Sequence, residues 1–141
     1  MMGYASTSYY LLKNPEKLHI HNHKTKELYK GKKVVYAHRG GSIEHPENTL
    51  QAFKASAKLG AAIETDVRCT KDGTVLVCHD PNFKRLGGKD ALIVDTPLAE
   101  VPKSYASKFM IEFGHHDYEV KKTDEARYCT LDELFATLPK T

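Results

Sequence analysis

Apolar residues recur along the chain in short runs that predict alternating strands and helices. The first run, 34–37, reads Val-Val-Tyr-Ala and predicts a strand. Apolar positions at helical spacing follow in 50–57, and they predict a helix that Asn48 or Thr49 caps and Gly60 ends. This part of the chain is thus predicted to fold as a strand followed by a helix.

Two further strands are predicted on either side of a turn. Side chains in 62–68 alternate between apolar and polar, the sequence Lys-Asp-Gly at 71–73 is typical of a turn, and 74–78 is a second apolar run. The two strands could pair as a hairpin or run parallel within a barrel, and in both arrangements their polar ends converge. The order strand, helix, strand over 34–68 favours a parallel α/β arrangement.

The remaining sequence is less regular until its last helix. Residues 82–128 contain several glycines and prolines, and they predict an irregular excursion with one or two short helices. Residues 130–138 predict a compact helix, because Thr130 and Glu133 have the spacing of a capping box and Pro139 follows the last apolar position.

Composition narrows the class of protein. The 141 residues form one domain or part of one. The net charge is only +3 and basic residues are interspersed with acidic ones, so the chain lacks the pattern of a nucleic-acid-binding protein. Cys69, Cys78 and Cys129 are an odd number and have no C-x-x-C spacing. We therefore expect buried or half-buried thiols in a reducing compartment rather than a zinc site.

Residues 1–32 are predicted to form a polar leader before the folded region. Residues 1–12 are uncharged, but as a helix they would reach about 18 Å against a hydrocarbon core of about 30 Å, so they cannot span a bilayer. They lack the basic start of a signal peptide, and they are either a frayed terminus or the end of a longer membrane helix. His19, His21 and His23 could form a metal cluster on a strand, although solvated linker histidines are the commoner case. We expect an intracellular protein, either cytoplasmic or membrane-associated.

Three pairs of polar residues lie at or near the ends of predicted strands and carry the candidate chemistry. They are His38 and Arg39, Glu64 and Asp66, and His79 and Asp80. Two imidazoles can act as general acid and base, an arginine can bind phosphate through two hydrogen bonds, and two carboxylates at this spacing suit Mg²⁺ or Ca²⁺. Each pair alone has an ordinary structural explanation, such as a strand-end cap or a solvent-facing edge. Together they indicate phosphodiester chemistry at one end of a sheet.

Five blocks of sequence resemble, in their order and spacing, the glycerophosphodiester phosphodiesterase family. The blocks are 37–41, 46–49, 63–67, 70–73 and 77–80. A further block, 130–134, resembles a later helix of the family, so the resemblance runs from about residue 34 to the C-terminus.

The resemblance implies a (β/α)₈ barrel of the TIM type in which 82–128 is a small insertion. It implies an enzyme of lipid metabolism, a phosphoric diester hydrolase that cleaves glycerophosphodiesters to an alcohol and glycerol 3-phosphate with the help of Mg²⁺ or Ca²⁺. It assigns the acid/base roles to His38 and His79, and the metal ligands to Glu64 and Asp66. Arg39 would contact the phosphate, and Glu47 would either support the site through hydrogen bonds or have a purely structural role. Independently of the resemblance, Asp80 is expected to orient His79 or to cap its loop.

The Gly40-Gly41 pair and the leader segment 7–13 resemble the membrane-anchored branch of the family, some members of which cleave lysophospholipids to a lysophosphatidate. The substrate is therefore expected to be a small glycerophosphodiester or a lysophospholipid, with membrane association as an option and no nucleic-acid partner.

The chain departs from the family in length. The resemblance places a third metal carboxylate on the strand after 130–138, beyond the last residue, and a barrel of this type typically needs about 250 residues. Residues 33–141 are therefore expected to be the N-terminal part of a barrel: a fragment, or half of a complementing pair. The alternative is a truncated, catalytically incomplete relative that binds or regulates. A third class, a barrel phosphodiesterase acting on inositol phospholipids or sphingomyelin, is disfavoured by the Pro-Glu-Asn-Thr block at 46–49.

Overall fold

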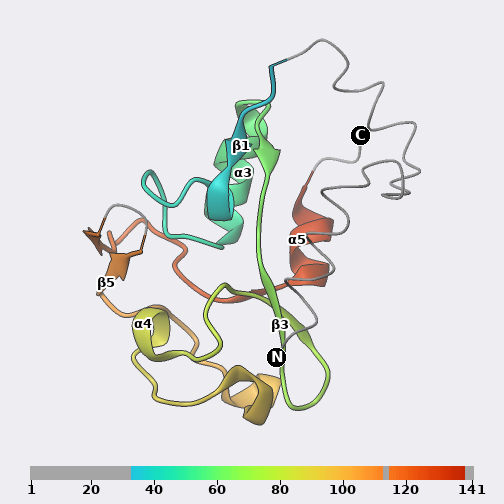
Figure 1. Ribbon diagram of the computed structural model, residues 1–141, viewed down its shortest axis with the longest axis vertical. Coiled ribbons are helices and arrows are strands. Elements are labelled where there is room, and N and C mark those ends of the chain that lie inside the picture. The colour runs from blue at the N-terminus through green and yellow to red at the C-terminus, as the bar shows by residue number, and fades with distance from the viewer. Residues whose placement is uncertain (1–32, 113–114, 139–141) are drawn as a thin grey trace, which may run out of the picture. The chain divides into compact units, whose positions relative to one another are not determined.

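The computed structural model describes residues 33–112 and 115–138 of the chain. The chain divides into two units, Met1–Lys33 and Val34–Thr141, and the helices and strands given below all belong to the second unit (Figure 1). The predictions for the leader, for its histidines and for Pro139 lie outside the described residues. Within the described residues, no helix is long and apolar enough to cross a membrane.

A strand–helix–strand unit comes first, as the sequence predicts. Strand β1 (Tyr36–Ala37) pairs in parallel with β2 (Ala62–Ile63), and helix α3 (Leu50–Lys58) connects them. Figure 1 shows α3 against this pair of strands, and its buried Phe53 packs with Ile63. The parallel pairing matters for the site because it brings the residues that follow both strands to the same edge.

The ends of α3 follow the predicted chemistry. Of the two candidate caps, Thr49 is the one used, since its side-chain oxygen accepts a hydrogen bond from the backbone N–H of Ala52 at 3.2 Å. Gly60 follows the last turn with φ at +72°, a left-handed conformation that glycine adopts without strain.

The next two strands form a hairpin, which is one of the two arrangements that the sequence left open. Strand β3 (Val67–Cys69) pairs antiparallel with β4 (Val75–Val77), and β4 also pairs antiparallel with β7 (Cys129–Thr130). The backbone N–H of Cys78 donates to the carbonyl of Asp66 at 2.9 Å, so the pairing continues past β3 and β4. The residues after β4 therefore lie beside those before β3.

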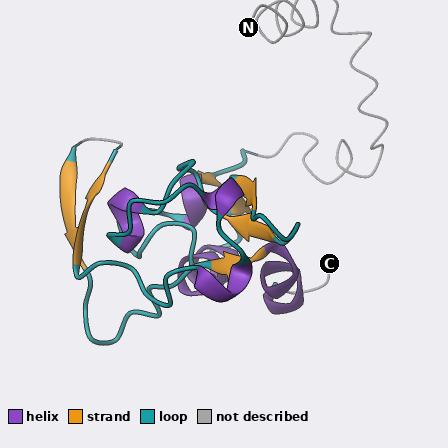
Figure 2. Cartoon of the chain, turned by 90° about the horizontal axis from the view of Figure 1, so that it is seen from below, coloured by secondary structure: helices purple, strands orange, loops and turns teal. Residues whose placement is uncertain are grey.

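The segment 82–128 is more ordered than its composition indicates. Its elements are α4 (Lys84–Gly87), η3 (Ile93–Asp95), η4 (Leu98–Glu100), β5 (Lys108–Ile111) and β6 (His116–Glu119). The short helices were predicted, but the β5–β6 hairpin was not. Figure 2 shows this hairpin standing out from one side of the folded unit. The two strands do not alternate clearly between apolar and polar residues, because the apolar Met110 is exposed between Phe109 and Ile111 and because β6 buries only Tyr118.

The folded unit has two clusters of buried side chains. One lies under the segment 82–128 and is rich in aromatic rings, with Tyr128 edge-on to Phe83 and Tyr105 at centroid distances of 5.2 and 4.8 Å. The other joins α3 to the last helix, α5 (Leu131–Thr137), whose predicted capping box is present. The segment 82–128 thus packs around a buried cluster that also includes Leu76 and Cys78, which joins it to β4.

The cysteines are free thiols, and two of the three fit the prediction. Cys78 and Cys129 are buried, and burial raises the pKa of each to about 12, which keeps them protonated and unreactive. The prediction was wrong for Cys69, which is exposed. Strand β3 carries Cys69, and all its residues are exposed because the hairpin presents this strand to solvent.

Gly40 and Gly73 share a backbone conformation that other residues rarely adopt, but they differ in the space available for a side chain. Gly40 and Gly73 both have left-handed φ values, +80° and +84°, but a Cβ on Gly40 would lie 2.7 Å from the Phe53 ring, whereas a Cβ on Gly73 would meet nothing within 4 Å. We expect Gly73→Ala to cost about 1–2 kcal/mol of unfolding free energy from the backbone alone. Gly40→Ala should cost about 1–3 kcal/mol more, because the buried ring cannot move away. Urea unfolding of both variants measures the difference; equal losses would show that the Gly40–Phe53 contact is not tight.

Candidate active site

His38 and Arg39 lie in a sharp turn directly after β1. The turn, η2 (His38–Gly40), is left-handed at Arg39, with φ at +51°, and the carbonyl of Arg39 accepts a hydrogen bond from the Asn48 backbone N–H at 2.8 Å. Non-glycine residues seldom adopt this conformation, and it persists where surrounding contacts fix it. The turn buries the Arg39 side chain and leaves that of His38 half exposed.

Glu64 follows β2 and reaches the His38 turn across the parallel strand ends. Its Oε2 lies 2.8 Å from His38 Nδ1 and accepts the backbone N–H of Arg39 at 3.0 Å. One carboxylate oxygen thus holds both the imidazole of His38 and the backbone of the turn at Arg39. The parallel pairing of β1 and β2 thus brings His38 and Glu64 together. For the predicted strands 62–68 and 74–78, the contact described is the backbone bond between Asp66 and Cys78.

Glu47 lies at the centre of a buried ionic cluster. It has no exposed surface, and its carboxylate accepts from Arg39 Nη1 at 3.0 Å and from Arg85 Nη1 and Nη2 at 2.8 Å each. Its backbone carbonyl accepts from the Tyr105 hydroxyl at 3.1 Å. Burying a carboxylate without such partners would be strongly unfavourable. Glu47 can therefore be buried only because the guanidinium groups of Arg39 and Arg85 pair with it.

Asp80 holds the second histidine. Its Oδ1 lies 3.1 Å from His79 Nδ1, and its two oxygens accept from Arg85 Nη2 at 3.0 Å and Nε at 2.8 Å. Burial acts to raise the pKa of Asp80, but the hydrogen bonds from Arg85 and His79 outweigh it and hold the pKa below its usual range. Burial likewise acts to lower the pKa of Arg85, and its bonds to Glu47 and Asp80 raise it overall.

Glu112 completes the network from the end of β5, at the tip of the hairpin. Its Oε2 lies 2.9 Å from Arg39 Nη2 and 3.3 Å from His79 Nδ1. Through Glu64, Arg39 and Glu112, the two histidines belong to one connected set of polar contacts. The sequence analysis missed Glu112, because Arg39 and His79 are more than thirty positions away and no sequence motif connects them to it.

The cluster around His79 has the form of a metal site, but its charge argues otherwise. His79, Asp80 and Glu112 each offer a ligand atom, and these atoms lie within 4.8 Å of one another. However, Arg39 contacts Glu112 and Arg85 contacts Asp80, so guanidinium groups already supply the positive charge that a cation would bring. The carboxylates of this cluster are therefore already charge-paired, which makes it a weaker candidate for a cation site.

Asp66 is the better candidate for a cation ligand. Its Oδ2 is buried and has no hydrogen-bond partner among the described residues. An orphaned carboxylate oxygen is unfavourable unless a cation or water satisfies it. Together with Glu64, two positions earlier, Asp66 therefore fits the predicted pair of metal ligands. The structure joins Asp66 to the site through its backbone bond to Cys78.

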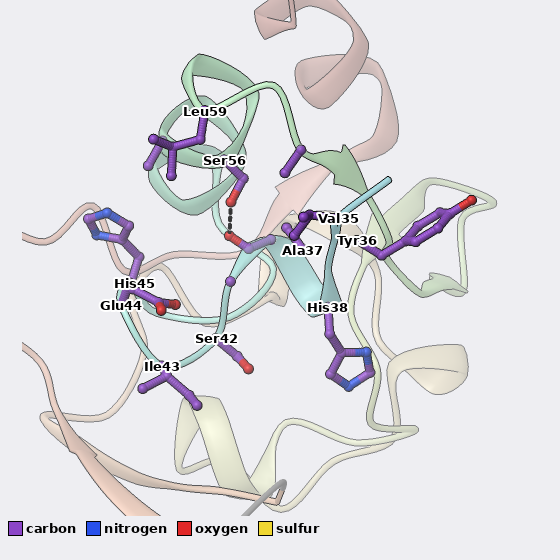
Figure 3. Close-up of a pocket in the computed structure, with 14 residues that line it drawn as sticks. Val35, Tyr36, Ala37, His38, Ser42, Ile43, Glu44, His45, Ser56 and Leu59 are labelled. Carbon is purple, nitrogen blue, oxygen red and sulfur yellow. Dashed lines mark hydrogen bonds between the residues drawn. The ribbon is translucent and has the colours of Figure 1, made fainter. Parts of the chain in front are cut away.

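A groove of about 560 Å³ lies between β1, the η2 turn and α3. Figure 3 shows its wall, where Ser56 Oγ donates to the carbonyl of Gly40 at 2.8 Å. Val35, Ile43 and Leu59 make it largely apolar and are themselves exposed. Of the polar network, the side chain of His38 alone lines this groove, so the candidate chemistry lies beside it and not within it.

Residues 38–141 match the model of the Glycerophosphoryl diester phosphodiesterase family. The chain belongs to this family. The resemblance inferred from the five sequence blocks is thus confirmed, and the mixed α/β fold agrees with it.

Named relatives and a solved structure support the family assignment. Lysophospholipase D GDPD1 of Homo sapiens is 36% identical over 140 residues, covering 99% of this chain and 42% of that protein. Glycerophosphodiester phosphodiesterase of Caldanaerobacter subterraneus subsp. tengcongensis is 41% identical over 105 residues, covering 74% and 40%. The crystal structure of glycerophosphodiester phosphodiesterase from Thermotoga maritima superposes with a TM-score of 0.54 at 34% identity, covering 76% of this chain and 40% of that one. The chain therefore spans 40–42% of the length of these family members.

Replacing Glu47 tests whether the ionic cluster is essential to the fold. We expect Glu47→Gln to lower the unfolding free energy by about 3–5 kcal/mol, because two buried guanidinium groups lose their shared counter-charge. Glu133→Gln is the matched control: Glu133 pairs with Arg127 at 2.8 Å on the surface, and its loss should cost less than about 1 kcal/mol. Similar losses in both variants, measured by chemical unfolding, would contradict the central role of Glu47.

Proposed function

We propose that the intact protein is a metal-dependent phosphodiesterase that hydrolyses glycerophosphodiesters or lysophospholipids, and that this chain supplies the N-terminal part of its (β/α)₈ barrel. The observation that carries the proposal is the connected polar network that joins His38 to His79 through Glu64, Arg39 and Glu112. The family assignment and the names of the relatives support it. The products would be an alcohol and glycerol 3-phosphate, or a lysophosphatidate from a lysophospholipid.

The two histidines are proposed as the acid/base pair. Nδ1 of each ring lies against a carboxylate, Glu64 for His38 and Asp80 for His79, so each ring is oriented and we assign proton transfer to Nε2. One imidazole takes the proton from the free glycerol hydroxyl as that oxygen attacks phosphorus. The other gives a proton to the departing alkoxide. Water then opens the resulting cyclic phosphate with the two roles exchanged.

Arg39 and the strand-end carboxylates are proposed to manage the phosphate charge. Arg39 would donate to a non-bridging phosphate oxygen, for which a planar guanidinium is suited. Glu64 and Asp66 would hold a divalent cation, Mg²⁺ or Ca²⁺, which when bound offsets the charge of the phosphodiester. Glu47 supports the site by holding Arg39 in place.

Alanine substitution of the histidines tests this assignment. We expect His38→Ala and His79→Ala each to lower kcat for glycerophosphodiester hydrolysis by about 10²-fold or more, since each removes one proton-transfer group. Chelation of divalent ions should abolish turnover, and added Mg²⁺ or Ca²⁺ should restore it. The control is His116→Ala, an exposed residue on β6 that should leave turnover unchanged. Unchanged kcat in both site variants would rule the mechanism out.

Glu112 must give way before substrate can bind as proposed. Its carboxylate contacts both Arg39 and His79, the two groups assigned to phosphate binding and proton transfer. A phosphate oxygen and this carboxylate would compete for the same donors. The hairpin tip therefore holds an internal anion at the place of the substrate's phosphate.

Removing this competitor should tighten anion binding. We expect Glu112→Gln to lower the Kd for glycerol 3-phosphate severalfold in calorimetric titration of the intact protein, because the amide binds a guanidinium more weakly than a carboxylate does. Glu119→Gln, an exposed change on the same hairpin, should leave Kd unchanged. Weaker binding in Glu112→Gln would instead show that Glu112 assists the ligand.

A further inference from the structure

The two buried arginines of the site differ in how many hydrogen-bond donors they have in use. A guanidinium group carries five N–H donors. In Arg85 all five have acceptors: Nε donates to Asp80 at 2.8 Å, Nη1 to Glu47 at 2.8 Å and to the carbonyl of Met110 at 2.9 Å, and Nη2 to Glu47 at 2.8 Å and to Asp80 at 3.0 Å. No donor of Arg85 remains for a substrate.

Arg39 has capacity that Arg85 lacks. Its Nη1 donates to Glu47 and its Nη2 to Glu112, while its Nε is buried without a partner among the described residues. Its partner Glu112 is exposed, so a substrate phosphate could take the place of this carboxylate on Arg39. Arg39 can therefore donate hydrogen bonds to a phosphate, whereas Arg85 cannot.

The acceptors of Arg85 are the residues that hold the proposed catalytic groups. Asp80 fixes Nδ1 of His79, and Glu47 holds the guanidinium of Arg39. Met110, whose carbonyl is the fifth acceptor, lies two positions before Glu112 at the hairpin tip. One side chain thus connects the supports of the acid/base group, the phosphate contact and the hairpin.

We propose that Arg85 is a positioning residue of the active site, which fixes Asp80 and Glu47 so that His79 and Arg39 keep their places, and which does not touch the substrate. This inference rests on the proposed phosphodiesterase function. Lysine cannot replace it, because an ammonium group has three donors on one atom and cannot supply the five hydrogen bonds that Arg85 makes to Asp80, Glu47 and the Met110 carbonyl.

Arg85→Lys in the intact protein tests the proposal, with Arg127→Lys as the matched control. Arg127 also forms a two-bond pair with a carboxylate, Glu133, but lies away from the site network. Three readouts are needed: kcat for a glycerophosphodiester, the Kd of glycerol 3-phosphate, and the ¹⁵N signals of the His79 ring, which report its tautomer when the imidazole is neutral.

We expect Arg85→Lys to stay folded, to lose at least tenfold in kcat, and to show His79 in a mixture of tautomers, since Asp80 no longer fixes Nδ1–H. Arg127→Lys should change none of these. If Arg85→Lys leaves both kcat and the His79 signals unchanged, the proposal is wrong. If it abolishes glycerol 3-phosphate binding without moving the His79 signals, Arg85 is a substrate contact and the proposal is also wrong.

Two further outcomes keep the two proposals distinct. If Arg85→Lys does not fold, Asp80→Asn provides the same test, because it breaks the Arg85–Asp80–His79 connection at similar volume and should release the His79 tautomer in the same way. If the wild-type intact protein shows no hydrolysis but Arg85→Lys shifts the His79 signals, the positioning role stands and the proposed function falls.

Discussion

The structure of the site depends on one interaction, the fully buried carboxylate of Glu47 between the guanidinium groups of Arg39 and Arg85. A carboxylate removed from water is stable only when charge-paired and hydrogen-bonded, so the three side chains must be placed together. They come from the turn after β1, the loop before α3 and the short helix α4. The cluster therefore fixes the relative positions of three segments that periodic hydrophobic patterning alone would leave loosely related.

Two residues with strained backbone conformations lie next to the same cluster. Arg39 and Asn48 both adopt left-handed conformations, with φ at +51° and +55°, and they are joined by the bond from the Asn48 N–H to the Arg39 carbonyl. The side chain of Asn48 is also used, since its Oδ1 accepts from the Thr65 hydroxyl at 2.7 Å. Such conformations cost of order 1–3 kcal/mol each, and the buried ionic pairs and hydrogen bonds offset that cost. The turn leaves the His38 side chain half exposed and buries that of Arg39.

The local parts of this arrangement could be predicted from the sequence, because caps, turns and parallel strand ends follow short-range rules. Thr49 and Thr130 cap their helices as expected, and Glu64 meets His38 because both follow parallel strands. Arg85 and Glu112 could not be found in this way. Their partners lie up to 73 residues away, and periodicity does not specify which charged side chains will pair. Arg85 gives one weak signal: it follows Asp80 by five residues, across a short loop into α4. Glu112 depends on a hairpin that the sequence pattern did not reveal.

The arginines of the site do not by themselves give it a charge that would attract an anionic substrate. The carboxylates of the site outnumber its guanidinium groups, with Arg39 and Arg85 set against Glu47, Glu64, Asp66, Asp80 and Glu112. With neutral imidazoles, this surplus of negative charge would repel a phosphodiester. In the proposed mechanism, a divalent cation on Glu64 and Asp66 would reduce the surplus at the strand ends, and displacement of Glu112 would remove a carboxylate from Arg39 and His79. Under the proposed function, cation binding and displacement of Glu112 would therefore be complementary requirements, because each reduces a different part of the negative charge.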